Sequence, residues 1–517
     1  MSEVESQDTT GGDRLQRTRS EKRERLIAQG INPYPYRFER THEAAVARVA
    51  LEDGESDGTL DEGGYGPEMS AAGRLVALRL HGGSAFADLE DESGRIQLHL
   101  KRDVLGEEAF EGLGLLDLGD WIGIHGSIFR TRRGEPTIRV TAIELLGKAL
   151  RPLPLGKSDV DAQTGERRSW GELSDKEERY RHRYVDLAVH PERREVFRRR
   201  ALLVSGLRAF LDGEGFTEVE TPALQPMYGG ASARPFVTHH HALDRTMYLR
   251  IADELYLKRL VAGGMERVYE ISKDFRNEGI DRSHNPEFTM LEFYQAFADY
   301  GDMMEMTERL LTRVARSVTG GTALTFGGKE ISLEPPYTRA RFTDLLEAAL
   351  GRDPLGMTDE EARSALKGRG VNGIEDAGRG RLLDKLFSEF VEHDLQEPTF
   401  VTDHPLELSP LAKVHRSDPA LTERFELYVA GMELANAFSE LTDPVDQRAR
   451  FEMQRALGAA GDEEAQPIDE DYLQAMEYGM PPIGGVGVGV DRLAMILLDQ
   501  PSIRDVILFP VLREEDS

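Results

Sequence analysis

The stretch Val268–Phe297, VYEISKDFRNEGIDRSHNPEFTMLEFYQAF, contains two runs of alternating apolar residues. A polar loop joins the runs and carries Gly279, Asp281, Ser283 and Asn285. Alternation with a period of two is typical of strands, and a polar, glycine-containing connection is typical of a turn. The stretch therefore predicts an antiparallel hairpin.

One face of this hairpin is too polar for a core. Arg276 and Glu278 are two residues apart on the first strand, and Phe288, Glu292 and Tyr294 have one parity on the second, so each set points to one side. A solvated face would explain a lone Arg/Glu pair. Five such residues in register predict a ligand site instead, with the opposite parity left for packing.

Composition limits the class of protein. The chain has 517 residues, 39% of them hydrophobic, which predicts two to four globular domains. It has no Cys, so disulfides, thiolate metal sites and cysteine nucleophiles are excluded. Without an apolar run long enough for a bilayer, we expect a soluble, cytoplasmic protein with no membrane partner. A net charge of −29 disfavours a general nucleic-acid coat, so any RNA contact must use local basic patches.

The first 68 residues are predicted to form a helical and acidic extension. Residues 1–30 are rich in charge and predict a frayed tail leading into a helix, either solvated or in contact with RNA. Leu51–Glu68 is acidic and rich in glycine, which predicts a mobile surface loop.

Residues 69–150 predict a small barrel. Five short alternating runs between Met69 and Ile143 fit an OB-fold, which binds single strands by stacking bases on aromatic side chains. Phe86 is the candidate stacking residue, although it could equally belong to the barrel core. The candidate polar contacts to bases are Arg74, Gln97 and Glu135.

A linker over residues 151–178 is predicted to separate the barrel from a catalytic domain over 179–517. That domain begins with the arginine-rich Arg179–Arg200, for which ion pairs with its own acids and contact with an RNA backbone are equally plausible. Gly215–Pro226, GFTEVETPALQP, predicts a strand ended by proline at an edge or interface. Ser317–Glu397 shows no chemistry and is interpreted as inserted packing material.

A second hairpin is predicted over Glu423–Leu441, with Ala430 and Gly431 in the turn. This turn places Glu426 and Glu433 on one side, where two hard carboxylates suit Mg²⁺; a solvated pair is the alternative. Strict alternation would put Asn436, Phe438 and Glu440 on the opposite side from Glu433, so a bulge is needed if all five serve one cavity.

The last informative stretch is Gly484–Leu497, GGVGVGVDRLAMIL. Its alternating glycines predict a strand with one bare face, against which a flat ligand can lie, although close packing of sheet on helix is the alternative. Asp491 is predicted to cap the following helix. Arg492 then stands in the first turn, where a guanidinium and the positive helix end favour phosphate.

These stretches together resemble the bacterial class II lysyl-tRNA synthetases over nearly the whole chain. The resemblance rests on GFTEVETPALQP, FRNEG with HNPEFTMLEFY, and GVGVGVDR, in that order and behind an N-terminal OB barrel. It implies an α+β fold, with an anticodon-binding OB-fold barrel followed by a catalytic domain made of an antiparallel sheet flanked by helices. It also implies ATP, L-lysine and tRNA-Lys as substrates, Mg²⁺ as cofactor, and a homodimer.

The resemblance also implies roles for individual residues. The catalytic cations are Arg276 and Arg492, and the ATP-binding set is Arg276, Glu278, His284, Asn285, Phe288, Glu426 and Arg492. The metal ligands are Glu426 and Glu433. Lysine is expected to contact Gly230, Glu254, Arg276, Glu292, Tyr294, Asn436, Phe438 and Glu440. The anticodon contacts are Arg74, Phe86, Gln97 and Glu135.

The expected chemistry explains these residue types. A carboxylate that attacks the α-phosphorus brings two anions together, so the site must be cationic but needs no general base. At the other end, acids rather than a cation are expected, with Glu440 discriminating for an ammonium group. Three rivals stay open: a synthetase for another amino acid, a relative that lysylates a protein, and a catalytically silent RNA-binding protein.

Overall fold

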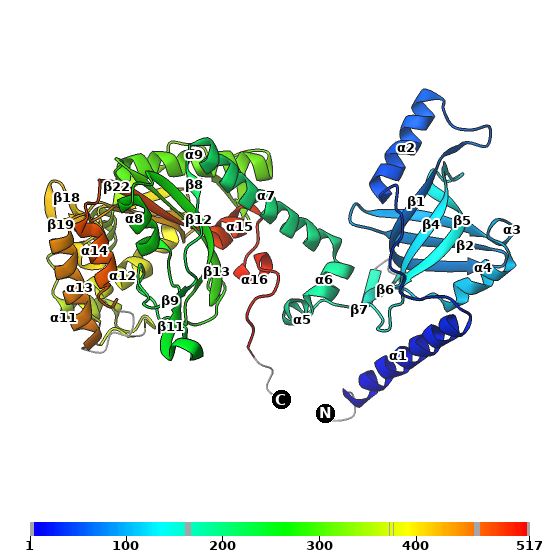
Figure 1. The fold of residues 1–517 in the computed structure, drawn as a ribbon, viewed down its shortest axis with the longest axis horizontal. Coiled ribbons are helices and arrows are strands. Elements are labelled where there is room, and N and C mark those ends of the chain that lie inside the picture. The colour runs from blue at the N-terminus through cyan, green and yellow to red at the C-terminus, as the bar shows by residue number, and fades with distance from the viewer. Residues whose placement is uncertain (1–4, 161–166, 372, 376, 460–465, 514–517) are drawn as a thin grey trace. The chain divides into compact units, whose positions relative to one another are not determined.

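The computed structural model describes residues 5–160, 167–371, 373–375, 377–459 and 466–513 (Figure 1). They form two compact units, Met1–Arg194 and Glu195–Ser517. The division falls inside helix α7 (Pro191–Gly213), whereas the sequence analysis begins the catalytic domain at residue 179. Among the described residues, no helix is long and apolar enough to span a bilayer.

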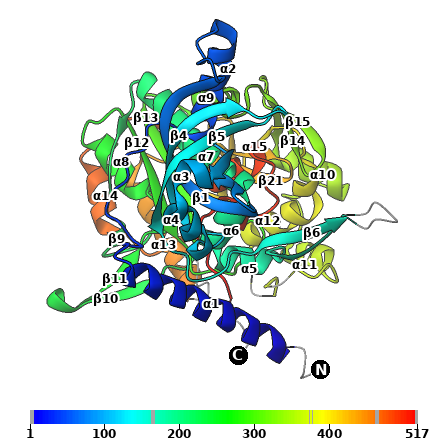
Figure 2. The same ribbon diagram turned by 90° about the vertical axis from the view of Figure 1, so that its right-hand side faces the viewer.

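The first unit contains a closed five-stranded barrel with the strand order β1-β2-β3-β5-β4. Figure 2 labels three of its strands, β4 and its two neighbours β1 and β5. This confirms the predicted OB-fold. Its strands are β1 (Tyr65–His81), β2 (Ser84–Glu90), β3 (Arg95–Lys101), β4 (Trp121–Arg130) and β5 (Pro136–Gly147). Alternate residues such as Leu98, Ile122 and Val140 fill the interior and are fully buried.

Helices and a small hairpin come before, between and after the barrel strands along the chain. They are α1 (Glu5–Ala28), α2 (Ala44–Asp57), α3 (Arg102–Leu105), α4 (Glu107–Gly112), η1 (Leu113–Leu115), β6 (Leu155–Val160), β7 (Arg167–Glu172), α5 (Lys176–Arg181) and α6 (Arg183–Val189). The predicted mobile loop over Leu51–Glu68 is wrong at both ends. Residues 51–57 complete α2, whose Leu51 is fully buried against the barrel core, and β1 already begins at Tyr65. The low hydrophobicity of the stretch concealed two leucines, Leu51 and Leu60, that pack against the barrel core.

The arginine-rich segment makes ion pairs with its own chain. Arg179 and Arg183 both contact Asp186, each at 2.7 Å, and Arg183 is 1% exposed. Arg200 pairs with Asp491. The ion-pair alternative is therefore confirmed for these three arginines.

The second unit is built on an eight-stranded sheet with the order β16-β17-β20-β21-β22-β13-β12-β8. The strands are β8 (Thr217–Glu218), β12 (Arg267–Phe275), β13 (Glu287–Ala296), β16 (Thr338–Arg341), β17 (Thr399–Thr402), β20 (Arg424–Val429), β21 (Met432–Ser439) and β22 (Ile483–Gly489). The hairpin predicted from Val268–Phe297 is confirmed as β12 and β13, which pair antiparallel with Glu270 opposite Glu292. The GFTEVETP segment supplies β8, confirmed as an edge strand.

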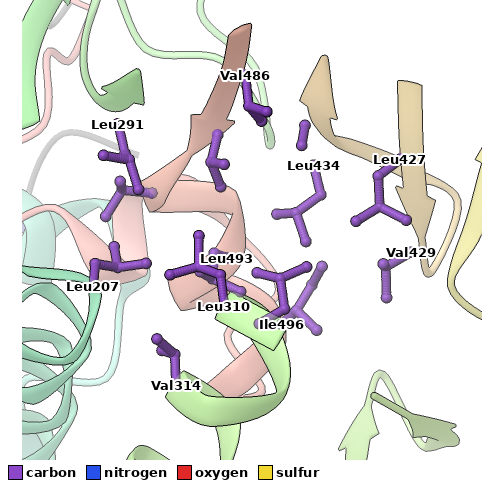
Figure 3. Packing of buried hydrophobic residues seen from close by; sticks show 14 of the residues in the cluster. Leu207, Leu291, Leu310, Val314, Leu427, Val429, Leu434, Val486, Leu493 and Ile496 are labelled. Carbon is purple, nitrogen blue, oxygen red and sulfur yellow. The ribbon is translucent and has the colours of Figure 1, made fainter. Parts of the chain in front are cut away.

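One face of this sheet is covered by helices α7, α9 (Tyr300–Thr319) and α15 (Val490–Leu497). Figure 3 shows Leu291, Leu427 and Val486 from the strands pointing toward Leu310 and Leu493 from the helices. Burying this apolar surface is the main stabilising term of the unit. It leaves the opposite face of β13, β22 and β21 free for a cavity.

The remaining elements of this unit lie around the sheet. They are β9 (Leu224–Gln225), β10 (Val237–His240), η2 (His241–Leu243), β11 (Arg245–Leu249), α8 (Glu254–Ala262), β14 (Ala323–Phe326), β15 (Lys329–Ser332), α10 (Phe342–Leu350), α11 (Asp359–Leu366), α12 (Arg379–Phe390), η3 (Glu392–Asp394), η4 (Leu406–Leu408), β18 (Val414–His415), β19 (Asp418–Thr422), α13 (Pro444–Ala459), α14 (Glu470–Glu477) and α16 (Ile503–Val506).

A bulge in the second predicted hairpin decides which residues face the cavity. Tyr428 pairs with Glu433 as predicted, but Leu427 pairs with Ala435, so Leu434 is an extra residue on β21. Leu434 and Ala435 both lie in the core. Glu433 and Asn436 can therefore face the same side, and the predicted bulge is confirmed.

We expect Leu310→Ala to lower the free energy of unfolding by ~2–5 kcal/mol, because Leu310 is fully buried in the core shown in Figure 3. Leu243→Ala is the matched control, since Leu243 is 60% exposed and its truncation should cost less than ~0.5 kcal/mol. Denaturant unfolding measures both. Equal losses in the two variants would contradict this assignment of the core.

Candidate active site

A cavity of ≈ 370 Å³ lies on the open face of the sheet in the second unit. It is lined by β13, β21 and β22, by the connection between β12 and β13, and by the first turn of α15. Of the residues predicted to bind ATP, lysine or metal, those that line it are Gly230, Glu254, Arg276, Glu278, His284, Asn285, Phe288, Glu292, Tyr294, Glu433, Asn436, Phe438, Glu440 and Arg492. Segments more than 200 residues apart in the sequence thus form one site.

Glycines make the floor of the cavity. Gly485, Gly487 and Gly489 line it, and Val486 and Val488 between them belong to the hydrophobic core, as the alternation in β22 predicts. A Cβ atom on Gly485 would lie 2.3 Å from both Glu440 Oε1 and Tyr294 Cε1. A side chain at Gly485 would therefore clash with Glu440 and Tyr294, which pack against this strand.

Two arginines and a histidine form one end of the cavity. The Arg276 guanidinium lies 5.1 Å from the ring centre of Phe288. Arg492 donates to the backbone oxygen of Glu433 at 2.7 Å and lies 3.1 Å from His284 Nε2. For Arg492 to donate there, His284 must carry its proton on Nδ1, which faces Asp281 at 2.8 Å. This end is cationic.

Several residues at this end differ in detail from expectation. Arg276 lies beyond the end of β12 rather than on the strand, and so does the exposed Glu278. Asn285 binds backbone groups at both ends of its amide, donating to the Glu287 oxygen and accepting from Val511 N–H. The prediction that Asp491 caps α15 is wrong.

Asp491 fails as a cap because its carboxylate is used by tertiary contacts. It is 2% exposed, accepts from the Thr289 N–H at 2.7 Å and pairs with Arg200. Helix α15 has no side-chain cap. A buried ion pair with a distant helix cannot be read from the local sequence.

The other end of the cavity is rich in buried carboxylates. Glu254, Glu292 and Glu440 are each 5% exposed or less. Glu292 accepts from Tyr294 Oη at 2.9 Å and from the Asp253 N–H at 3.2 Å. Burial, followed by the charges of Asp253 and Asp274, raises the pKa of Glu292 well above its usual value.

The expectation that only acids occupy this end is wrong, because two cations lie there as well. Lys258 is fully buried on α8, with its Nζ 2.5 Å from Glu254 Oε1 and also paired with Glu440. Burial alone would lower the pKa of Lys258, but Glu254 and Glu440 raise it, so the amine stays charged. Arg424 lines the cavity, binds Asn436 Oδ1 at 3.1 Å and pairs with Glu426. Each cation is already paired with an acid.

The candidate metal ligands occupy unequal positions. Glu433 lines the cavity, 3.3 Å from Arg492. Glu426 does not line the cavity, and its carboxylate accepts a hydrogen bond from Tyr428 Oη at 2.8 Å. Glu426 is paired with Arg424 and Glu433 with Arg492, and both carboxylates contribute to the raised pKa of a third acid, Glu392. Hard oxygen donors in excess of cations fit a divalent metal ion.

Two acids of the segment Ser317–Glu397, Asp384 and Glu392, interact electrostatically with Glu426 and Glu433, but neither lines the cavity. Desolvation and the charges of Glu433 and Glu426 raise the pKa of Glu392 to about 7, against an opposing hydrogen bond from Ser388. Two acids in a segment without a motif gave no signal in the sequence.

In the barrel, three of the four predicted nucleic-acid contacts lie together. Phe86 points outward between the buried Ala85 and Ala87, so the core alternative is wrong. It stacks on His99 with ring centres 4.5 Å apart. Gln97 accepts from Thr137 at 3.0 Å, next to the exposed Glu135.

Arg74 does not join this group. In the register of β1 and β2 it lies opposite Glu90, at the other end of β2. Its guanidinium donates to the Gly119 oxygen and lies 4.7 Å from the ring centre of Trp121. His99 was missed by the sequence analysis. Its outward parity on β3, opposite Phe86, was the available signal.

Behind Glu292 lies a fully buried layer of acids. Carboxylate oxygens of Asp253, Asp274 and Glu292 lie within 4.8 Å of one another, and the Arg250 guanidinium lies 3.0 Å from Asp253. Desolvation, then the charges of Asp274 and Glu270, raises the pKa of Asp253 to about 8. Asp253 therefore holds a proton at neutral pH that it loses on unfolding.

This predicts a pH-dependent stability. Between pH 4 and 8 the folded state binds the extra proton, so Asp253 makes the folded state less stable as pH rises, by at most about 1.4 kcal/mol per pH unit. Asp253→Asn should flatten the fall in unfolding free energy between pH 5 and 7.5. The control Asp244→Asn, at a side chain 95% exposed, should follow the wild type. Parallel curves for Asp253→Asn and wild type would contradict the raised pKa.

Comparison with known proteins agrees with this geometry. Residues 175–513 match the model of the class II tRNA synthetases (D, K and N), and residues 69–146 match an OB-fold nucleic acid binding domain. A protein named lysine–tRNA ligase from Moorella thermoacetica is 48% identical over 97% of this chain and 98% of its own. Another of that name, from Roseiflexus castenholzii, is 51% identical over 97% and 99%. The chain therefore belongs to the class II tRNA synthetases of the D, K and N type.

Proposed function

We propose that this protein is a lysine–tRNA ligase that activates L-lysine with ATP and transfers it to the 3′ end of tRNA-Lys. The observation that carries the proposal is the polarity of the cavity, with Arg276 and Arg492 at one end and Glu254, Glu292 and Glu440 buried at the other. Such a cavity suits a triphosphate and a diamino acid bound end to end. The relatives named lysine–tRNA ligase support the same conclusion.

In the first step, the lysine carboxylate attacks the α-phosphorus of ATP. A carboxylate oxygen to phosphorus bond forms, the bond from that phosphorus to the bridging oxygen breaks, and pyrophosphate leaves. We assign Arg276 to the carboxylate and the α-phosphate, and Arg492 with His284 to the outer phosphates. Phe288 and Arg492 enclose the adenine, with Glu278 at its amino group. Orientation of this kind contributes up to ~7–11 kcal/mol. The attacking group is a carboxylate, so no general base is needed.

The cofactor we propose is Mg²⁺, held by Glu426 and Glu433. When bound, it would neutralise charge on the phosphate oxygens. The excess of carboxylates around these two residues supports the assignment.

In the second step, the terminal ribose hydroxyl of the tRNA attacks the activated carbonyl, and AMP leaves. We assign residues 69–150 to the anticodon-binding barrel, 179–517 to the catalytic domain, 1–68 to an extension and 151–178 to a linker. We also propose a homodimer formed through the Gly215–Pro226 segment, whose edge strand β8 is exposed. The proposed location is the cytoplasm, where ATP and tRNA are available.

Selection of lysine is proposed to depend on Glu440, with Glu292, Tyr294 and Asn436 near the ε-ammonium group. Glu254 and the backbone of Gly230 then take the α-amino group. A synthetase for aspartate would need a free cation where Glu440 lies, and the cations there are already paired.

Lysine-dependent exchange of pyrophosphate into ATP tests the function. We expect exchange by the wild type, and for Glu440→Ala a loss of at least about 100-fold in kcat/KM for lysine, because a buried ion pair is broken. Glu305→Ala, at an exposed position on α9, is the control and should exchange normally. No exchange by the wild type would favour the silent RNA-binding alternative, and exchange with aspartate or asparagine would favour a different specificity.

For the barrel, we expect Phe86→Ala to weaken binding of tRNA-Lys by ~1–3 kcal/mol through loss of a stacking surface. Filter binding at fixed salt measures this. Pyrophosphate exchange without tRNA serves as the internal control and should not change. Unchanged tRNA affinity would contradict the assignment of Phe86.

A further inference from the structure

Lys258 lies behind two of the carboxylates that line the cavity. Its side chain is fully buried on α8 and is not among the residues that line the cavity. Its Nζ lies 2.5 Å from Glu254 Oε1 and also pairs with Glu440 Oε2. A single cation therefore joins the two carboxylates assigned to opposite ends of the amino acid.

The remaining oxygen of each carboxylate is directed elsewhere. Glu440 Oε1 is buried without a hydrogen-bond partner in the part of the chain that the structure describes, and it lies against Gly485. Glu254 Oε2 lies beside Gly230, 3.8 Å from where a Cβ on that glycine would be. Both glycines line the cavity. Lys258 thus takes one oxygen from each carboxylate, and the second oxygen lies next to a bare position of the cavity wall.

The charges at this end also fit a particular substrate. Arg424 is already paired with Glu426. If Glu254, Glu292 and Glu440 are all ionised when the substrate binds, they carry three formal negative charges against one positive charge on Lys258, which leaves two to be neutralised. Free lysine carries two ammonium groups, and its carboxylate would face Arg276. Buried charges that stay unpaired are costly, so this match favours a substrate with two ammonium groups.

We propose that Lys258 is a positioning residue for lysine selection. It fixes Glu254 and Glu440 with one oxygen each toward the cavity, and it sets the charge of the pocket to that of a diamino acid. This inference rests on the proposed lysine-activating function. Lys258 acts through the two carboxylates and not on the substrate itself.

The test compares Lys258→Met with wild type at pH 6.5, 7.5 and 8.5. The charged or titratable groups around the Lys258 site are Glu254, Glu292, Tyr294, Arg424, Glu440 and Tyr472. Without the cation, the carboxylates retain protons and lose their orientation. We expect KM for lysine in pyrophosphate exchange to rise at least about tenfold at neutral pH, with a smaller change in KM for ATP. The KM for lysine should also fall with rising pH more steeply than in wild type.

Calorimetric titration of lysine, without ATP, should show the same loss of affinity. Lys273→Met is the matched control, since Lys273 on β12 is 44% exposed and its ion pair with Glu287 is long, at 3.9 Å. It should match wild type throughout. A folded Lys258→Met with unchanged KM and pH profile would overturn the proposal.

A second pair of variants decides the matter if Lys258→Met does not fold. Glu254→Gln keeps Lys258 beside Glu440, whereas Glu254→Gln/Lys258→Met removes both members of the helical pair, a change that buried ion pairs often tolerate. We expect the double variant to have a several-fold higher KM for lysine and a steeper pH dependence than Glu254→Gln. Equal values in the two would overturn the inference. Failure of wild type to bind lysine would instead overturn the proposed function.

Discussion

The cost of burying charge shapes the whole cavity. Glu254, Glu292 and Glu440 are removed from water at one end, where each ionised carboxylate needs a cation or a proton. Lys258 supplies a cation, and Asp253 behind Glu292 holds a proton. At the other end, Arg276 and Arg492 are exposed enough to receive anions. The substrate that completes this pattern has a charged amine at one end and, at the other, a carboxylate that attacks a phosphate.

The fold produces this separation of charge through the alternation of its strands. In β13, β21 and β22, one parity packs on α7, α9 and α15 and the other faces the cavity (Figure 3). A single extra residue at Leu434 brings Glu433 to the same face as Asn436. The glycines of β22 leave room for the side chains of Glu440 and Tyr294. The core and the site are thus two faces of the same strands.

Features with a local periodic signal could be predicted from the sequence. The hairpin of β12 and β13, the barrel and the bare strand β22 follow from alternation and turn chemistry, whereas the bulge was required only if Glu433 and Asn436 were to share one cavity. Features that depend on distant partners could not. Asp491 was expected to cap a helix because its pairing with Arg200 is not visible locally. Lys258 gave no signal because a lysine four residues after a glutamate is an ordinary helical pair. Asp384 and Glu392, which interact electrostatically with Glu426 and Glu433, come from a segment without any motif.

The two ends of one cavity are expected to bind opposite charges, the amine of lysine at one end and the phosphates of ATP at the other. A crystal structure with L-lysine and a non-hydrolysable ATP analogue would show where each charge lies. We expect the ε-ammonium within hydrogen-bonding distance of Glu440 Oε1, with the carboxylate and α-phosphate at Arg276. Lysine bound with its ε-ammonium directed away from Glu440 and Glu292, or triphosphate bound away from Arg492, would contradict it.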